Sequence, residues 1–269
     1  STDGFVVVDD STPLVTNELG ILSKSTENST DIYLLMYKRD FGLCLKDYFT
    51  LTGYPTLLPR YALGIWWNRD IIYSMDNIKL LLSSFANNEI PLSVLLLNEF
   101  WHIKNKDNML LDKTGFTFNK ELFPTPNKLT TYLHDRGVRL GLELDPIEGI
   151  KNVEPAYDEF ADELNYKNKE TIPFLAFDKM FIILYFEKLI NPLTKLDIDY
   201  YWIDYKKDVK ALRALTYYHI RDFKQNEYKR PMLLARNTGV AAHRNGVLYS
   251  GQTIVSWTTL KFLPFFNAS

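Results

Sequence analysis

The sequence has few of the residues and patterns that mark disulfide-rich, metal-binding or nucleotide-binding proteins. Its one cysteine, Cys44, cannot form a disulfide within the chain, and its apolar neighbours Leu43 and Leu45 predict a buried structural thiol. The histidines are His102, His134, His219 and His243. They have neither short ligand spacing nor cysteine companions, so a metal site is not expected. A glycine-rich phosphate loop is missing too, and the sequence predicts no cofactor.

The sequence also lacks a strong charge of one sign and long apolar runs. The formal net charge is −2 and the basic residues are dispersed, so neither nucleic acid nor an anionic membrane is an expected partner. No apolar run reaches the roughly 18 residues that a membrane-spanning helix needs. The chain is long enough to fold as one large domain. Its 269 residues, of which 46% are hydrophobic, can bury a substantial core.

Strand and helix signals alternate along the chain. Short apolar runs bounded by polar, glycine or proline residues predict strands at 61–67, 92–97, 138–144, 200–204, 232–236 and 248–250. Apolar positions at three-to-four spacing predict amphipathic helices at 78–85, 128–135, 179–189 and 209–223. Residues 174–177 are ambiguous and fit a further strand. The alternation predicts a parallel β/α architecture.

One strand signal ends on a carboxylate. The run Tyr201-Trp202-Ile203-Asp204-Tyr205 holds Asp204 among three aromatic residues. Barrel enzymes place catalytic groups at the carboxyl ends of their strands, so this position suits a nucleophile. The alternative is that Asp204 only caps the helix after it.

A series of segments resembles glycoside hydrolase family 31, the α-glucosidase family, and the segments come in the family's order. They include Leu57–Gly64, Trp66–Arg69, Trp101-His102, Gly115–Asn119, Arg236, His243-Arg244 and Tyr249–Trp257. The resemblance implies a (β/α)8 barrel of the TIM type. It places residues 174–177 in an excursion, Asp204 at the end of strand four and Gln252 at the end of strand six.

The same resemblance implies a shortened barrel. Residues 1–56 match the remnant of an N-terminal β-sandwich and linker, and residues 57–269 match a partial barrel domain truncated to about six strands. An open parallel sheet exposes unpaired backbone groups, so a protein partner that completes the barrel is a possible companion.

The chemistry that the resemblance implies is retaining hydrolysis of an α-glycosidic bond. That reaction uses two carboxyl groups about 5 Å apart, one as nucleophile and one as acid/base. Asp204 matches the nucleophile, whereas Gln252 stands at the acid/base position. A primary amide donates hydrogen bonds but cannot deliver a proton to a leaving alkoxide. The interpretation is therefore an α-glycosidase relative with weak or lost activity.

The resemblance also assigns substrate contacts, to Arg236, Asn98, Trp67, Trp101 and His243. The tryptophans suit either stacking on a sugar or packing of the barrel. Asn98 and Phe100 stand where the family has two aspartates, which indicates that other polar positions have changed together with Gln252.

Three alternatives remain open. A neighbouring acid could replace the missing one, the candidates being Glu99, Glu148 and Asp208. The chain could instead be a pseudoenzyme that binds an α-glucoside-like carbohydrate or takes part in protein assembly without catalysis. It could also be one part of a split barrel.

Overall fold

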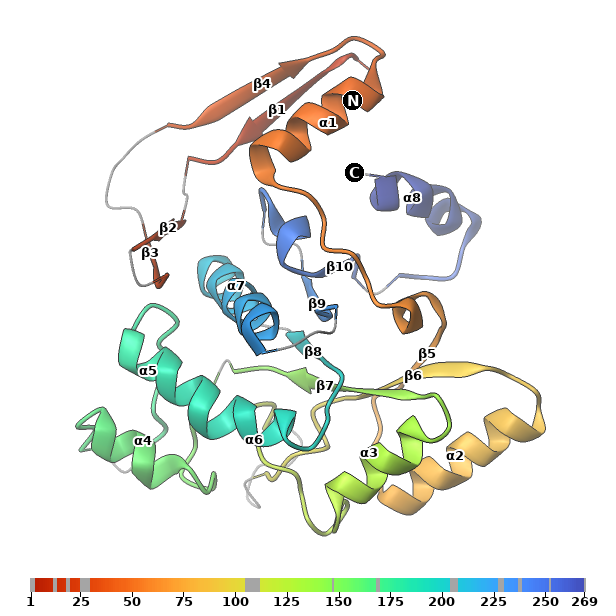
Figure 1. Ribbon diagram of the computed structural model, residues 1–269, viewed down its shortest axis with the longest axis vertical. Helices are drawn as coiled ribbons and strands as arrows, with labels where there is room; N and C mark the ends of the chain where they lie inside the picture. The colour runs from red at the N-terminus through yellow and green to blue at the C-terminus, as the bar shows by residue number, and fades with distance from the viewer. Residues whose placement is uncertain are drawn as a thin grey trace.

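The structure, a computed structural model, describes residues 3–11, 14–17, 20–24, 30–104, 112–146, 148–167, 170–203, 208–226, 230–236, 239–251 and 253–268. Its centre is one parallel sheet in the order β10-β9-β8-β7-β6-β5 (Figure 1). The strands are β5 (Ile65–Asn68), β6 (Leu92–Leu97), β7 (Arg139–Leu144), β8 (Tyr200–Ile203), β9 (Leu233–Arg236) and β10 (Val247–Tyr249). Every neighbouring pair is parallel. The predicted α/β architecture of about six consecutive parallel strands is confirmed, and it forms a half-barrel.

The first predicted strand began too early. Residues Arg60–Leu63 form the 3-10 helix η1, and β5 starts only at Ile65. Pro59 fixes an extended entry, and its carbonyl accepts from the Ala62 backbone N–H at 3.1 Å, which closes a turn before the strand. The other five predicted strands match within one residue at each end, and Asp204 lies outside the described residues.

The predicted helical segments fall on helices. These are α2 (Met75–Asn87), α3 (Pro126–His134), α5 (Lys179–Leu184) with the π-helix η3 (Tyr185–Ile190), and α7 (Val209–Asn226). The excursion between β7 and β8 also carries α4 (Tyr157–Glu163) and α6 (Asn191–Thr194). The ambiguous residues 174–177 form no strand and lie within this excursion. The described part of the barrel region also contains the 3-10 helix η4 (Ala242–Asn245) and α8 (Trp257–Ala268).

The two faces of the sheet have different cores. Leu95 and Tyr201 belong to the large cluster between the sheet and the helices, whereas Leu96 and Tyr200 belong to a smaller cluster on the concave face. Side chains alternate because successive residues of a strand point to opposite faces. Gly141 makes room for Tyr200 on the concave face, since a Cβ at position 141 would lie 2.1 Å from the Tyr200 ring.

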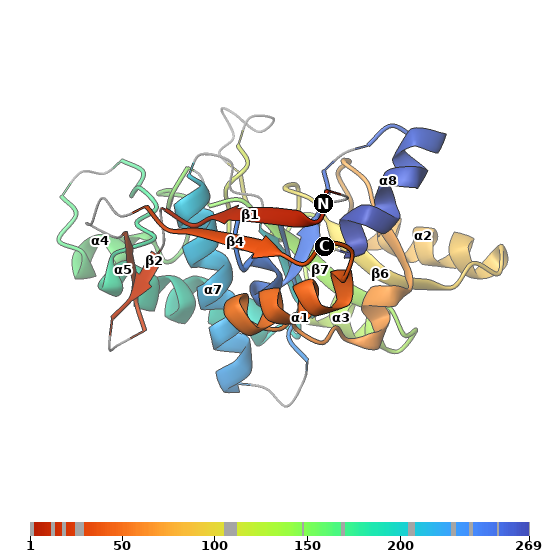
Figure 2. The same cartoon turned by 90° about the horizontal axis from the view of Figure 1, so that it is seen from above.

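The N-terminal region is a separate antiparallel arrangement. Strands β1 (Phe5–Asp9) and β4 (Ile32–Met36) pair with each other, as do β2 (Leu14–Thr16) and β3 (Leu22–Lys24). Helix α1 (Phe41–Thr52) lies beside β4 (Figure 2). The β2–β3 hairpin contacts α7, where the Leu22 backbone N–H donates to the Tyr218 hydroxyl at 2.8 Å. The predicted boundary at residue 56 stays a prediction.

Cys44 differs from its expected state. It lies on α1 and is half-buried instead of fully buried. Helix α1 covers β4 with part of its surface only, and the neighbouring Leu43 is exposed.

Within the described ranges, no helix is long and apolar enough to cross a bilayer.

A buried carboxylate joins the strands at their amino ends. Asp199, which immediately precedes β8, accepts from His134 Nε2 at 2.7 Å and from the Leu140 backbone N–H at 2.8 Å. Arg139 Nη1 lies 3.4 Å from its other oxygen. These contacts connect α3, β7 and β8 and fix the register of β8 against β7.

Two buried histidines are held neutral by the core. Burial lowers the pKa of His219 to about 3, and its Nε2 lies 3.1 Å from the Tyr185 hydroxyl. Burial likewise lowers the pKa of His102 to about 4, against a smaller opposing effect of the hydrogen bond with the Ile103 carbonyl. Because an unfolded histidine titrates near 6.5, protons bind the unfolded chain first as the pH falls.

We therefore expect the free energy of unfolding to be highest above about pH 6.5 and to fall as the pH drops toward 3. Each of these two histidines should lower it by about 2 kcal/mol between pH 7 and pH 5. Urea unfolding of the wild type and of His219→Gln at both pH values measures this. The variant should lose about 2 kcal/mol less than the wild type over that interval. Equal losses in the two proteins would contradict the buried neutral state of His219.

Candidate active site at the carboxyl ends of the strands

The strands that carry the predicted catalytic positions end at one level. Ile203 at the end of β8 pairs with Ala235, and Arg236 at the end of β9 pairs with Tyr249 at the end of β10. Neighbouring strands are about 4.8 Å apart, so β8 and β10, with β9 between them, are separated by about 10 Å. Asp204 and Gln252 come after β8 and β10 in the sequence but lie outside the described residues. Their convergence stays a prediction.

Arg236 lies at this edge on the concave face. It is two residues beyond Leu234, which packs in the concave cluster. Its guanidinium carbon is 5.6 Å from the centroid of the Tyr249 ring, a distance at which cation and ring attract. Tyr249 in turn packs edge-on against Trp202 at 5.2 Å. Arg236 is thus placed on the strand next to β8, and its role as a substrate contact stays a prediction.

Two amides meet at the ends of β5 and β6. Asn68 Nδ2 donates to the side-chain oxygen of Asn98, and it also lies 3.3 Å from the Leu96 carbonyl oxygen. Asn98 is the position where the resemblance predicts an aspartate in related proteins. These two side chains therefore offer hydrogen bonds at this edge but carry no negative charge.

Phe100 is the other position at which the resemblance predicts an aspartate, and a cation lies above its ring. Lys104 Nζ lies 4.3 Å from the ring centroid. The ammonium is buried and makes no hydrogen bond with any residue that the structure describes. Burial lowers the pKa of Lys104, although Glu99 and Asp112 act in the opposite direction. An aromatic ring thus faces a lysine here.

The two tryptophans predicted as sugar contacts serve packing in this structure. Trp101 is 1% exposed, and its indole N–H donates to the Glu143 carbonyl oxygen at 2.9 Å. Trp67 faces the helices, because its N–H donates to the Tyr73 hydroxyl at 2.8 Å and its ring packs on Phe85 at 5.3 Å. The geometry favours the packing interpretation for both.

The residues of β5 that face the concave side are Trp66 and Asn68, not Trp67. Trp66 belongs to the concave cluster and lies 5.2 Å from the Tyr200 ring. Asn68 is two residues further on and shares that face. The alternation of side chains along a strand was the available signal, since Trp66 and Trp67 must point in opposite directions.

His243 lies in the crossover between β9 and β10, away from the carboxyl edge. Its Nε2 is 2.8 Å from the Gly53 carbonyl oxygen, and its ring packs against Tyr48 and Phe49 of α1 at 5.5 and 5.3 Å. Arg244 Nη1 reaches the Thr52 carbonyl oxygen at 3.3 Å. The structure brings His243 to the N-terminal segment and not to Arg236.

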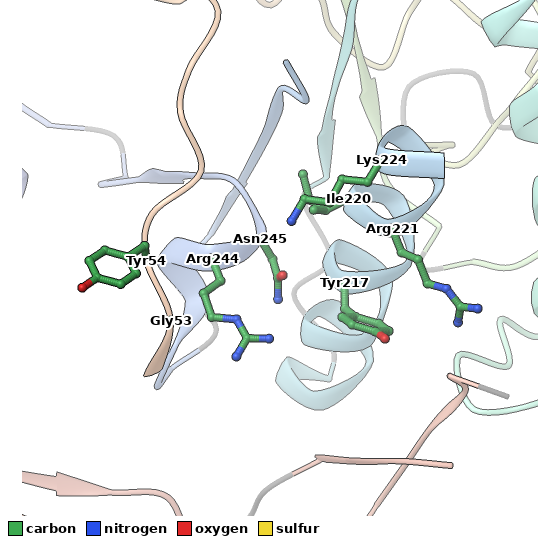
Figure 3. A pocket seen from close by; sticks show the side chains of 8 residues that line it. All are labelled: Gly53, Tyr54, Tyr217, Ile220, Arg221, Lys224, Arg244 and Asn245. Carbon is green, nitrogen blue, oxygen red and sulfur yellow. The ribbon is translucent and has the colours of Figure 1, made fainter. Parts of the chain in front are cut away.

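Arg244 and Asn245 also face α7 across a small cavity (Figure 3). The cavity is about 290 Å³ in volume, and Tyr217 and Lys224 of α7 line its other side. It belongs to the seam between η4 and α7.

Two candidate replacement acids are held by cations. Lys151 Nζ contacts both Glu148 and the buried Asp112. Lys113 Nζ lies 3.8 Å from Glu99, whose side chain is 15% exposed. Both candidate acids are therefore engaged in ion pairs with lysines.

Asp208 caps a helix. Its carboxylate accepts from the backbone N–H groups of Lys210 and Ala211 at 2.8 and 3.2 Å, and Lys24 lies 3.4 Å away. Burial acts to raise the pKa of Asp208, but the hydrogen bonds and Lys24 together lower it. Asp208 is therefore ionised at neutral pH and poorly suited to protonate a leaving group.

No group of three or more metal-ligating side chains occurs among the residues that the structure describes.

Comparison with known proteins identifies the family to which this half-barrel belongs. Residues 55–264 match the glycosyl hydrolases family 31 TIM-barrel domain. An α-xylosidase of Saccharolobus solfataricus is 24% identical over 258 residues, which are 85% of this chain and 34% of that protein. The α-xylosidase XylQ of Lactiplantibacillus pentosus is 28% identical over 170 residues, 61% of this chain and 21% of that protein.

Solved structures share the fold. A family 31 α-glucosidase from Bacteroides thetaiotaomicron superposes with a TM-score of 0.67 at 18% identity, over 97% of this chain and 48% of that one. A family 31 α-xylosidase from a soil metagenome, complexed with xylose, gives 0.68 at 15% identity, over 96% of this chain and 42% of that one. The chain spans less than half the length of each of these four proteins. By the match to its TIM-barrel domain, this chain belongs to glycosyl hydrolase family 31.

Proposed function

We propose that this chain is a family 31 α-glycosidase relative that retains the nucleophile position but hydrolyses natural glycosides weakly or not at all. The observation that carries the proposal is Gln252 at the acid/base position, with no described candidate poised to replace it. Glu99 and Glu148 lie beside lysines, and Asp208 is an ionised helix cap. General acid/base assistance is worth about 10²- to 10⁴-fold in rate, so its loss is large without being absolute.

The reaction divides into two steps that depend differently on the missing acid. In the first, the Asp204 carboxylate attacks the anomeric carbon while the leaving oxygen takes a proton. In the second, water attacks the glycosyl ester and gives up a proton to the same acid/base group. Gln252 can neither give nor take that proton. Arg236, held at the edge by Tyr249, can still bind sugar hydroxyl groups.

We expect α-glycosyl fluorides to label the protein, because fluoride leaves without protonation and the second step then stalls. Both α-glucosyl and α-xylosyl fluoride should be tried, since the relatives include α-glucosidases and α-xylosidases. Intact mass and peptide mapping should find one glycosyl group on Asp204, and Asp204→Asn should prevent it. Labelling of both proteins alike would mean that Asp204 is not the nucleophile.

Replacing the amide with a carboxyl group should restore turnover. Gln252→Asp is expected to raise the rate of maltose or xylosyl-glucose cleavage by about 10²- to 10⁴-fold over the wild type. Gln252→Asn is the matched control, having the same size as aspartate without its proton, and should leave the rate unchanged.

If the wild type already cleaves such a disaccharide at about 1 s⁻¹ or faster, the proposal of lost catalysis is wrong. Should Gln252→Asp alone stay inactive, Asn98→Asp and Phe100→Asp combined with it test the other two changed positions. Failure of that triple variant, properly folded, would count against an inherited site.

A protein-assembly role is the second candidate, and exposed apolar side chains favour it. Ile254, Val255 and Trp257, just before and at the start of α8, are 85%, 102% and 82% exposed. Leu63, beside the edge strand β5, is 80% exposed. Among the described residues, β5 and β10 each pair on one side only. Apolar groups beside open sheet edges are typical of surfaces that another segment covers.

Multi-angle light scattering of the purified chain tests this role. We expect an oligomer that Trp257→Ser combined with Val255→Ser converts to a smaller species, while Ile71→Ser, at a separate exposed position, leaves it unchanged. A wild type that stays monomeric at high micromolar concentration contradicts assembly with itself.

A further inference from the structure

The small cavity between η4 and α7, which we call the seam cavity, is lined by cations without acids. Arg221 and Lys224 of α7 and Arg244 of η4 line it. Among the residues that the structure describes, no aspartate or glutamate does so. A hollow of about 210 Å³ shares Arg244 and Tyr217 with it and adds Arg213, again with no described acid in its lining. Positive charges that share a cavity repel one another, and an anion between them relieves that repulsion.

Lys224 and Arg244 face each other across the seam cavity. Figure 3 shows Arg244 extending from η4 toward α7 and Lys224 extending from α7 toward η4. Within the described ranges, neither forms an ion pair. Arg213, in contrast, lies 3.4 Å from Asp10, and Arg221 points away from η4 and is bonded to the β2–β3 hairpin. The charge without an acidic partner is therefore concentrated at Lys224 and Arg244.

Arg244 is held in place by the segment that follows α1. Its Nη1 donates to the Thr52 carbonyl oxygen at 3.3 Å, and its own carbonyl oxygen accepts from the Thr56 hydroxyl at 2.8 Å. Gly53 leaves room for the arginine stem, since a Cβ there would lie 2.5 Å from Arg244 Cδ. A guanidinium has five N–H donors, so a neutral carbonyl uses one of them and leaves the charge in place. The side chain is thus positioned in advance, which lowers the entropy cost of binding a ligand.

Two neutral donors line the same cavity. Tyr217 and Asn245 are both half-buried there. In the part of the chain that the structure describes, neither side chain makes a hydrogen bond. A phenol hydroxyl and a primary amide can each donate. A ligand with several acceptor oxygens can therefore bond to both walls of the cavity, to these two groups as well as to the cations.

We propose that the seam cavity binds a phosphate group, either as the free ion or at the end of a small phosphomonoester. A phosphate group carries close to two negative charges at neutral pH and has at least three strong acceptor oxygens, which suits two facing cations with donors around them. The volume of about 290 Å³ is at the small end of ligand sites, as a compact ligand requires. The site uses none of Asp204, Arg236 and Gln252, so it stands whether or not the candidate active site is functional.

The test is isothermal titration of the full chain at low ionic strength with sodium phosphate and, in parallel, with glycerol 3-phosphate. Lys224→Gln and Arg244→Gln should each weaken binding about tenfold, because each removes one charge-assisted hydrogen bond. Lys128→Gln is the matched control. It removes an exposed positive charge from α3, outside the seam cavity, and should leave the affinity unchanged. Tighter binding of glycerol 3-phosphate supports a phosphomonoester as the ligand, and tighter binding of inorganic phosphate supports the free ion.

The proposal is overturned if neither compound gives saturable heat at about 10 mM, well above a weak dissociation constant of about 1 mM. It is equally overturned if Lys128→Gln weakens binding as much as Lys224→Gln does, because the protein would then respond to net charge alone. Lys224 is exposed and has no partner among the described residues, so Lys224→Gln should fold as the wild type does. The test therefore does not depend on whether Arg244→Gln, which loses the contact with Thr52, folds.

Discussion

Burial of β8 on both faces is the constraint on which the rest of the structure depends. All four of its residues are buried, and alternation sends Tyr200 and Trp202 to the concave cluster and Tyr201 and Ile203 to the helices. A shift of one residue would exchange these sets, which differ in shape and in neighbours. Asp199 holds the entry of the strand through three contacts. The register fixed in this way decides which side chains line the surfaces at the two ends of β8.

At the carboxyl end, that register sets which strand ends lie level with one another. Ile203 ends level with Ala235, one residue before Arg236, and Arg236 is level with Tyr249. At the amino end, the same register places the Tyr201 side chain between the sheet and the helices, beside a cavity of about 480 Å³ that we call the amino-end cavity. One buried strand therefore serves two separate surfaces. A change in its packing would disturb both, whereas a change at one edge need not reach the other.

The positions of the strands could be predicted from the sequence because each strand is marked by a local pattern of residues. Compact apolar runs with polar boundaries place five of the six within one residue at each end. Residues 60–63 were different, since a proline-led turn of apolar residues has the same composition as a strand. The direction of Trp67 could be derived from alternation once β5 was located, but composition alone made Trp66 and Trp67 look equivalent. The position of His243 and the amino-end cavity could not be predicted, because both depend on contacts between distant parts of the chain. His243 has a partner 190 positions earlier, and the cavity combines residues between positions 59 and 230.

The side chains at the carboxyl edge depend on one another. Framework residues such as Gly141 remain matched to their neighbours, because the Tyr200 ring fills the space that any larger residue would need. The polar edge, in contrast, now has an amide pair at Asn68 and Asn98 and a lysine above Phe100. An aspartate at position 100 would meet the buried Lys104 ammonium, and that ion pair would be stronger than the contact with the ring. Introducing acids at this edge therefore also changes the charge balance around their neighbours, and the substitutions are coupled rather than independent.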